Sequence, residues 1–442
     1  MRSVAQHSVP VDAAGRGDVR EHTPTRKRYW VVILGFAVAF ITYVDRAAMG
    51  QAALSIRADL HLSTVQLGYV FAAFGLAYSM FELPSGWLGD WIGPRKVLTR
   101  IVLWWSFFTA ATGFAWNYAS MLVMRFLFGM GEAGCYPNLA KVYSTWLPRE
   151  ERLRAEGFKA ASGRWGGAIT PVIFVYLQQW LGWRGVFQVF AISGVIWAVI
   201  FYTWYRDDPR ERSGVNAAEL DLIGSGPKGS GHRDVPWGVF LRSRSAWLLW
   251  ANWFCYSYGF YFYLTWLPTY LQQARHMNLQ KTAALAGLPL FSAGLGSIFS
   301  GFVCAWLLQM TRRIVFVRRA IAITGFASAA ILLIVFTRLD SPLWTVVALT
   351  ASSFTAEFAG PVTWTTCMDL GGRYVGSLAG AMNTLGQLGG TVAPAVIGYI
   401  LKWTGYDWPI VFYVSAGVYG CGILCWTFLD PATSLDRDLT KR

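Results

Sequence analysis

Long apolar stretches recur along the whole chain and constrain its fold more than any other feature. About twelve of them hold roughly 20 or more mostly apolar residues, which lets a helix cross a hydrocarbon layer of about 30 Å. Of the 442 residues, 55% are hydrophobic and only 14% are charged, too apolar a composition for one soluble core. The sequence therefore predicts an all-α membrane protein with twelve transmembrane helices.

The predicted spans follow one another closely except in the middle of the chain. They cover about residues 29–52, 65–88, 94–115, 118–142, 155–179, 183–205, 244–272, 281–309, 314–337, 343–368, 374–400 and 408–429. Residues 206–243, rich in Gly, Ser, Pro and charge, are expected to link two halves. The predicted organisation is a tail (1–28), a six-helix bundle (29–205), a linker (206–243), a second six-helix bundle (244–429) and a second tail (430–442).

A repeated glycine pattern supports two related halves. Gly163 to Pro171 in the fifth span and Gly386 to Pro394 in the eleventh share the spacing G-x-x-G-G-x-x-x-P. Such a six-plus-six duplication is a frequent design of membrane carriers, whose substrate site lies near the midplane between the halves.

The basic residues predict the orientation of the chain in the membrane. About 28 of the 38 Lys and Arg lie in the tails and the even-numbered connections, and about 6 in the odd-numbered ones. Both termini are therefore expected on the cytoplasmic side of a bacterial-type inner membrane, with no signal peptide and a disordered first tail. The net charge of +14 then reflects topology and gives no reason to expect a nucleic-acid partner.

Neither a metal site nor enzyme chemistry is expected. All six cysteines lie in apolar spans without the spacing of a zinc site, and all five histidines lie outside the spans. No phosphate-binding or metalloprotease motif is present. We expect no cofactor other than a proton gradient.

The connection after the second span has a distinctive motif. Gly86, Asp90, Gly93 and Arg95 stand in the run GWLGDWIGPRK, which resembles the signature loop of the major facilitator superfamily. The resemblance implies that Asp90 helps to lock one conformation across the interface of the halves, while Arg95 holds the cytoplasmic end. In the second half Ala305 takes the place of Asp90, which weakens the argument for a symmetric latch.

Charges inside spans are the sharpest functional signal, because each costs roughly 2.5–3.5 kcal/mol to insert. The first span has Asp45 and Arg46, and the fourth has Arg125 and Glu132 two helical turns apart on one face. These four side chains are expected to form one neutralising cluster that couples a proton to an anion. A purely structural ion network is the alternative.

These runs narrow the resemblance. Tyr43-Val-Asp-Arg46, Arg125 to Gly134, and Asn383 with the glycines after it are similar to the anion:cation symporter family, which includes proton symporters for hexuronates, aldonates and glucarate. The resemblance implies that Arg46 binds the substrate carboxylate, that Asp45 and Glu132 carry protons, and that Arg125 organises them.

Further pocket candidates are Tyr43, Tyr78, Trp364 and Asn383, whose polar groups suit a hydroxylated anion. Each of them is alternatively a packing residue. Arg164 and Glu357 stay ambiguous, since Arg164 serves either the anion or the helix backbone, and Glu357 is a pocket acid, a third proton site or a partner of Arg164.

Three further charged residues, Glu82, Lys141 and Asp369, are expected to snorkel or to pair at the cytoplasmic gate.

The sequence thus predicts a transporter that takes up a small organic anion with protons, most simply a sugar acid such as a hexuronate, aldonate or aldarate. An aromatic or dicarboxylic acid is the alternative cargo, and an anion exchanger or a non-transporting anion sensor the alternative function. We expect a monomer whose partners are the anion, protons and the lipid bilayer.

Overall fold

The computed structural model describes residues 23–224, 235–277, 279–339, 341–432 and 435. These residues form helices joined by short turns, and there is no strand among them. Most of the two predicted tails and the middle of the predicted linker lie outside the described residues.

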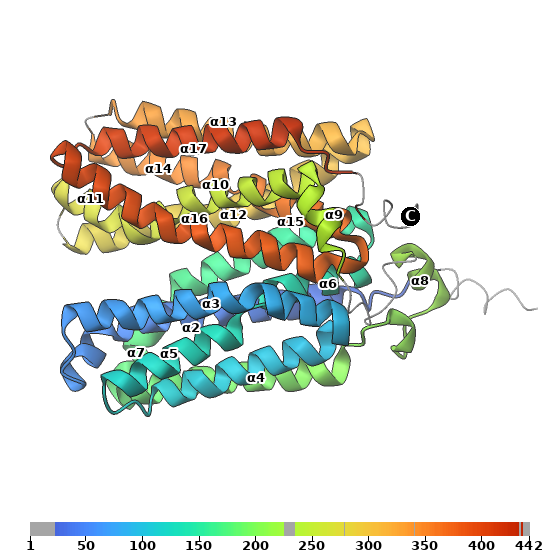
Figure 1. The fold of residues 1–442 in the computed structure, drawn as a ribbon, viewed down its shortest axis with the longest axis horizontal. Helices are drawn as coiled ribbons and strands as arrows, with labels where there is room; N and C mark the ends of the chain where they lie inside the picture. Colours follow the sequence, from blue (N-terminus) through green and yellow to red (C-terminus); the bar gives the residue numbers. More distant parts are fainter. Residues whose placement is uncertain (1–22, 225–234, 278, 340, 433–434, 436–442) are drawn as a thin grey trace, which may run out of the picture.

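The helices gather into two groups that lie side by side in Figure 1. The first bundle consists of α2 (Tyr29–Asp59), α3 (Thr64–Ile92), α4 (Pro94–Thr112), α5 (Tyr118–Glu132), α6 (Cys135–Trp146) and α7 (Arg149–Trp204). The second bundle consists of α10 (Arg244–Thr265), α11 (Leu267–Gln273), α12 (Leu279–Thr311), α13 (Ile314–Phe336), α14 (Pro342–Ala356), α15 (Ala359–Gly371), α16 (Val375–Thr404) and α17 (Trp408–Phe428). Between the bundles run η1 (Pro209–Glu211), α8 (Ala217–Ile223) and α9 (Trp237–Arg242), and η2 (Gly372–Tyr374) precedes α16.

Two glycines with positive φ interrupt helical segments of the first bundle. Gly182 (φ 65°) breaks α7, which therefore crosses the molecule twice. Gly134 (φ 87°) separates α5 from α6, and a side chain there would collide with Ser85. Because residues other than glycine rarely adopt these angles, both breaks are fixed by sequence. Counting α7 twice, and α5/α6, α10/α11 and α14/α15 once each, gives twelve spans among the described residues, as predicted.

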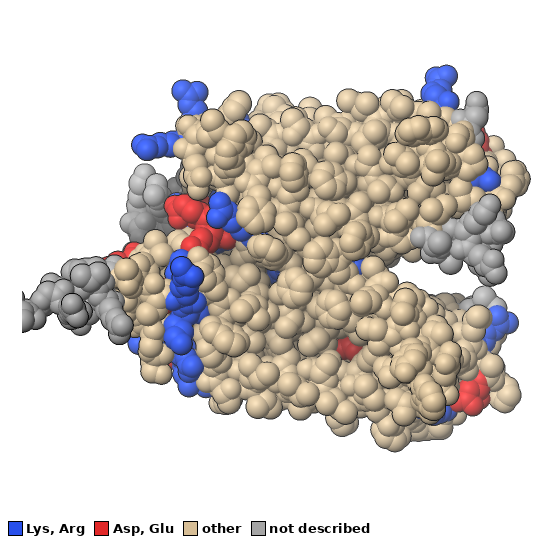
Figure 2. All heavy atoms as spheres, turned by 180° about the vertical axis from the view of Figure 1, so that it is seen from behind, with Lys and Arg blue, Asp and Glu red and all other residues tan. Residues whose placement is uncertain are grey.

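The exterior of both bundles is apolar along most of its length. Large side chains such as Phe107, Trp180 and Leu343 are exposed there, and the visible charges in Figure 2 gather toward the two ends. Seven helical stretches are long and apolar enough to cross a membrane by themselves, and the stretches 149–204 and 342–404 each include more than one predicted span. An apolar belt between charged ends is the arrangement that a bilayer stabilises.

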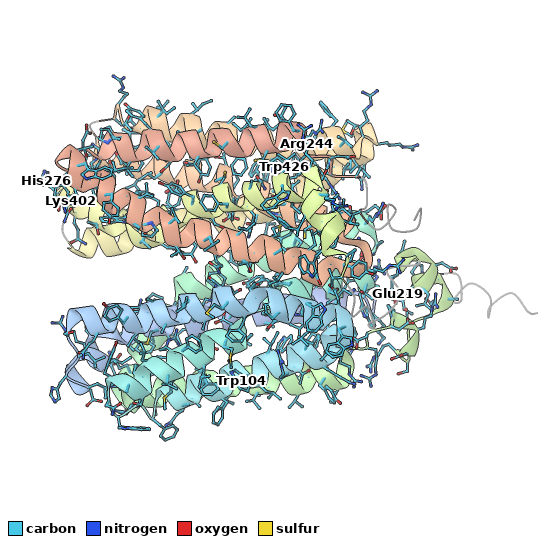
Figure 3. All side chains as sticks on the ribbon, viewed as in Figure 1. Trp104, Glu219, Arg244, His276, Lys402 and Trp426 are labelled. Atoms are coloured by element: carbon cyan, nitrogen blue, oxygen red, sulfur yellow. The ribbon has the colours of Figure 1, made fainter. Side chains whose placement is uncertain are left out.

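We name the two ends of the molecule by what lies there. The linker end includes α8, α9, the start of α2 and the end of α17, and the far end is the opposite one (Figure 1). Figure 3 places Glu219 and Arg244 at the linker end, and His276 and Lys402 at the far end. The bundles meet chiefly where α7 packs on α12 and α3 packs on α16.

Candidate binding site between the bundles

Two adjoining cavities of about 90 and 320 Å³ lie between the bundles. Leu264 and Leu290, close to the far end, line only the larger cavity, whereas Glu156 and Trp364 line only the smaller. The walls common to both are Tyr43, Arg46, Arg164, Trp253, Tyr256, Asn383 and Gln387. Figure 2 shows the surface hollowed between the bundles at the far end. The interior therefore opens toward the far end and narrows toward the linker end.

Arg46 in α2 and Glu132 at the end of α5 form a buried ion pair. The Nε of Arg46 donates to Oε1 of Glu132 at 2.5 Å, and Glu132 is fully buried. The guanidinium lies over the ring of Tyr78 at 4.6 Å, while its Nη2 is buried without a hydrogen-bond partner. A guanidinium that borders both cavities and keeps a free donor is suited to a carboxylate ligand.

The other two members of the predicted charge cluster are not directly paired. Both carboxylate oxygens of Asp45, and Nε of Arg125, are buried without a hydrogen-bond partner in the described structure. Arg125 instead lies over the ring of Phe128 at 4.3 Å. Among the described residues, only Arg46 and Glu132 of these four form an ion pair. One of the two pairs of the predicted cluster is therefore present. Buried charged groups without partners are costly to keep in a folded protein.

Arg164 in α7 connects the two bundles. Its Nε and Nη2 donate to Oε1 of Glu357 at 3.1 and 2.9 Å, and its Nη1 and Nη2 donate to the hydroxyls of Tyr43 and Tyr256 at 3.1 and 3.0 Å. Ser297 completes the site by donating to Oε2 of Glu357 at 2.9 Å. Glu357 thus pairs with Arg164, which is one of the three roles open to it, and it also lines the smaller cavity.

Asn383 in α16 makes a second connection across the cavity. Its Nδ2 donates to Oε1 of Glu82 at 2.6 Å and to the hydroxyl of Tyr78 at 3.3 Å, while its Oδ1 accepts from Trp253 at 3.1 Å. Glu82 is fully buried and also accepts from the backbone of Gly134 at 2.7 Å. Glu82 therefore pairs between the bundles, and the alternative of a snorkelling side chain is wrong.

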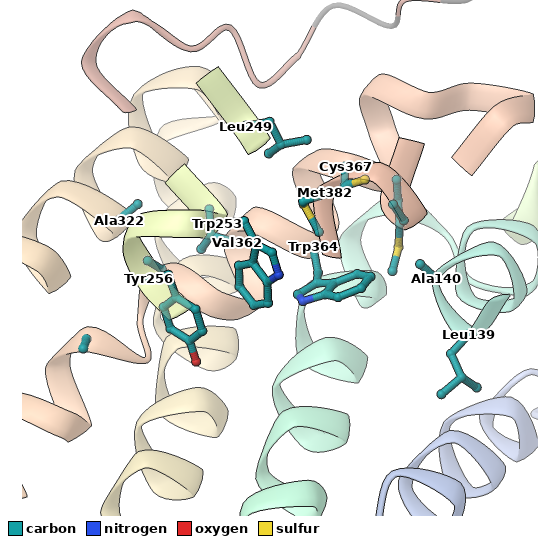
Figure 4. Packing of buried hydrophobic residues seen from close by; sticks show 14 of the residues in the cluster. Leu139, Ala140, Leu249, Trp253, Tyr256, Ala322, Val362, Trp364, Cys367 and Met382 are labelled. Atoms are coloured by element: carbon teal, nitrogen blue, oxygen red, sulfur yellow. The ribbon is translucent and has the colours of Figure 1, made fainter. Parts of the chain in front are cut away.

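The predicted pocket aromatics lie where the sequence placed them. Tyr43 and Tyr78 line the smaller cavity from the first bundle, and Trp364 lines it from α15. Trp364 packs edge-on against Trp253 with ring centroids 5.6 Å apart, as the close-up of the buried cluster illustrates (Figure 4). The structure thus brings all five predicted substrate-binding residues to one cavity.

Lys159 and Glu156 are site residues that the sequence reasoning missed. They lie three residues apart on α7, their Nζ and Oε2 atoms are 2.5 Å apart, and both line the smaller cavity. Lys159 also lies over the ring of Trp364 at 4.5 Å. The available signal was a Lys and a Glu at helical spacing near the start of a predicted span.

Asp90 in α3 closes the linker end on one side of the interface. Its carboxylate accepts hydrogen bonds from the backbone and hydroxyl of Ser377, both at 2.7 Å, and from the backbone of Gly376 at 3.1 Å. Lys141 pairs with the same carboxylate at 3.0 Å. Gly86 lies against the Gly376 carbonyl so closely that a side chain would not fit.

Gly93 and Arg95, from the same motif, make contacts within the first bundle. Gly93 has φ 92° and ends α3, and the Arg95 guanidinium donates to the carbonyl of Tyr202 at 2.7 and 3.0 Å. The Arg95 backbone donates to Asp207 at 2.9 Å, and burial raises the pKa of that carboxyl. Arg95 forms no ion pair or hydrogen bond with the second bundle among the described residues, so it holds the linker end without joining the interface.

Asp369 in α15 supplies a second latch at the linker end. Its carboxylate pairs with Arg152 at 3.0 Å and Arg149 at 3.5 Å from α7, and with Arg318 at 2.7 Å from α13. The motif position held by Ala305 lacks an acid, yet Asp369 on another helix of the second bundle supplies one. Both bundles therefore contribute an acid to the closed end.

Comparison with known proteins identifies the fold and the family. A family model described as Major Facilitator Superfamily matches residues 35–394. The chain is 33% identical over 415 residues to a probable sulfoacetate transporter of Cupriavidus necator, covering 93% of this chain and 96% of that protein. It is 32% identical to a probable galactarate/D-glucarate transporter of Bacillus subtilis, with 88% and 89% covered.

A solved structure agrees at the level of the fold. The proton:xylose symporter structure with bound 6-bromo-6-deoxy-D-glucose superimposes with a TM-score of 0.73, at 13% identity, over 95% of this chain and 100% of that one. The relatives confirm the resemblance to the anion:cation symporter family and the prediction of a transporter rather than an enzyme.

Proposed function

Because the chain belongs to the Major Facilitator Superfamily, we propose that it is a secondary transporter that takes up a small organic anion together with protons by alternating access. The observation that carries this proposal is the Arg46–Glu132 pair, whose arginine lines both cavities and keeps one guanidinium nitrogen without a hydrogen-bond partner. An anionic cargo is the natural partner of such a site, because a carboxylate can form a bidentate pair with guanidinium.

A sugar acid is the preferred cargo class, with hexuronates, aldonates and aldarates as the candidates. Relatives are named as transporters of galactarate and glucarate, of D-galactonate and of hexuronate. The hydroxyls of Tyr43 and Tyr256 and the amides of Asn383 and Gln387 line the cavities and suit a hydroxylated chain.

The ion pair also suggests how the proton is coupled. When a substrate carboxylate reaches Arg46, it competes with Glu132 for the same guanidinium. Glu132, left buried without its cation, then binds a proton instead of remaining charged in an apolar interior. Asp45, the residue directly before Arg46, is the second proton carrier. Arg125 stabilises whichever of the two acids is ionised. Anion and proton thereby enter the cavity together.

The closed linker end and the open far end fit one state of an alternating-access cycle. Rocking of the bundles would break the contacts of Asp90 and Asp369 and open the linker end. The excess of basic residues assigns that end to the cytoplasm of a bacterial-type inner membrane, with both termini there. One chain lines the whole cavity, so we propose that the monomer is the working unit.

Uptake into proteoliposomes under an imposed pH gradient tests this function. Purified protein is screened against labelled hexuronates, aldonates, aldarates and aromatic acids while the internal pH is recorded. Saturable uptake accompanied by proton entry supports symport. Uptake that requires an internal anion and moves no proton would replace symport with exchange, and binding without uptake would make the protein a sensor.

A further inference from the structure

Three basic side chains line the smaller cavity, and they differ in how many of their donors are used. Arg164 donates from all three of its nitrogens, to Glu357, Tyr43 and Tyr256. Arg46 is paired with Glu132 but keeps Nη2 free. The third, Lys159, has the largest unused capacity.

Lys159 is 2% exposed, and its Nζ has no hydrogen-bond partner of acceptable geometry in the described structure. Its only ion pair there is with Glu156, one helical turn earlier on α7. An ammonium carries three donors, so most of the hydrogen-bonding capacity of Lys159 is not used by the described protein groups. Desolvating a lysine in this way is costly unless a ligand supplies the missing acceptors.

The ammonium of Lys159 lies among aromatic rings that line the smaller cavity. The Nζ lies 4.5 Å from the ring centre of Trp364 and 5.3 Å from that of Tyr136, and both rings line the same cavity. These aromatic faces stabilise a cation without competing for its N–H donors. Arg46, on helix α2 of the same bundle, also lines this cavity. Two partly unsatisfied cations thus face one small space.

We propose that Lys159 is a second anion-binding residue, and that the cargo is a small dianion whose two acid groups are held by Arg46 and Lys159. This inference rests on the proposed function, in which Arg46 binds the first acid group. Glu156 neutralises Lys159 while the cavity is empty, and Glu132 does the same for Arg46. The nearby Arg164 stays with Glu357 and serves the contact between the bundles.

The test compares ligands that differ by one acid group. Galactarate and galactonate have the same carbon skeleton, with two carboxylates and one, and sulfoacetate against glycolate repeats the comparison in a shorter molecule. Half-saturation for uptake and for competition is measured in proteoliposomes of the full chain. The wild type is expected to prefer each dianion by about tenfold or more, the effect of one charge-assisted contact.

Substitution then assigns that preference to a residue. Lys159→Gln should raise the half-saturation concentration of dianions about tenfold, and that of monoanions less than about twofold. Lys159→Arg should restore the preference, because it keeps the charge. Lys402→Gln makes the same change at an exposed position of the far end. It should leave the half-saturation concentrations of dianions and monoanions unchanged.

The possible failures are distinguishable. A wild type that takes up monoanions and dianions equally well would overturn the dianion inference and leave the proposed function intact. Equal loss of both ligand classes in Lys159→Gln would make Lys159 a structural residue. Should Lys159→Gln not fold, the wild-type ligand preference and the Lys159→Arg variant still decide the question. Absence of saturable uptake for every anion would defeat the proposed function as well.

Discussion

The interior of this transporter contains two Arg–Glu pairs of the same chemistry, and they are built for different purposes. Arg46 and Glu132 belong to the same bundle, and their pair leaves one guanidinium nitrogen of a cavity-lining arginine without a hydrogen-bond partner. Arg164 and Glu357 belong to different bundles and are surrounded by hydroxyls from Tyr43, Tyr256 and Ser297. The two pairs therefore differ in unused hydrogen-bonding capacity although their charges are the same, and on the proposed function this difference separates binding from structure.

The largest expected effect lies in the first pair. Arg46→Ala should abolish anion binding, with a loss of at least about a hundredfold, because Arg164 is already paired with Glu357 and Lys159 is expected to hold only the second acid group. Arg46→Lys should keep part of the affinity, since it retains a charge without the planar fork. Equilibrium binding to detergent-solubilised protein checks both, and unchanged affinity in Arg46→Ala would remove this residue from the site.

The acid of the same pair should separate coupling from binding. Glu132→Gln keeps the size of the side chain but removes its ability to ionise, so accumulation driven by a pH gradient should cease. Exchange of labelled for unlabelled anion across the membrane should persist at a reduced rate. Uptake and counterflow measured on the same vesicles provide the comparison, and equal loss of both would contradict a coupling role.

The second pair should respond mainly in stability. Removing one partner of a buried pair typically costs about 3–5 kcal/mol, so Arg164→Met or Glu357→Leu alone should lower the Tm clearly. The double variant should recover much of that loss, because no unpaired charge remains. Thermal unfolding in detergent measures this, together with anion affinity, which should change far less than in Arg46→Ala. A double variant as unstable as the worse single one would argue against a pair.

The latches at the linker end should mainly alter the balance of conformations. Asp90→Asn weakens three hydrogen bonds and one ion pair, at a cost of about 1.5–3 kcal/mol for the closed state. Labelling of a cysteine introduced at the linker end of the cavity should then rise about tenfold or more. Equal labelling in wild type and variant would show that Asp90 does not hold that end closed.

The smallest expected effect is that of Arg95. Its contacts lie within the first bundle and on an exposed surface, where such interactions are worth about 0–1 kcal/mol. Arg95→Gln should therefore leave the cysteine labelling of the linker end within about twofold of wild type. A rise in labelling as large as that of Asp90→Asn would show that Arg95 does stabilise the interface of the bundles.

Features set by local sequence were predictable. Apolar runs of about 20 residues located the twelve spans, and intramembrane charge singled out Arg46, Arg125 and Glu132. The sequence reasoning even noted Glu357 as a possible partner of Arg164, but could not choose, because the two residues are 193 positions apart and meet only when the bundles associate.

Other features depended on tertiary packing. Asp369 on α15 supplies the acid that the motif position on α12 lacks. No local sequence pattern reveals this replacement. Asp45 and Arg125 were expected to join the cluster, yet neither makes an ion pair among the described residues. Lys159 and Glu156 were visible in the sequence at a three-residue spacing, but their position in the cavity follows only from how α7 faces α15.

Proton uptake on anion binding tests the central claim most directly. Purified protein in weakly buffered detergent is mixed with the transported anion while the pH of the medium is recorded. If the anion displaces Glu132 from Arg46, the wild type should take protons from the medium, and Glu132→Gln should bind the anion with much less uptake. Binding without proton uptake in the wild type, or equal uptake in both proteins, would contradict the account.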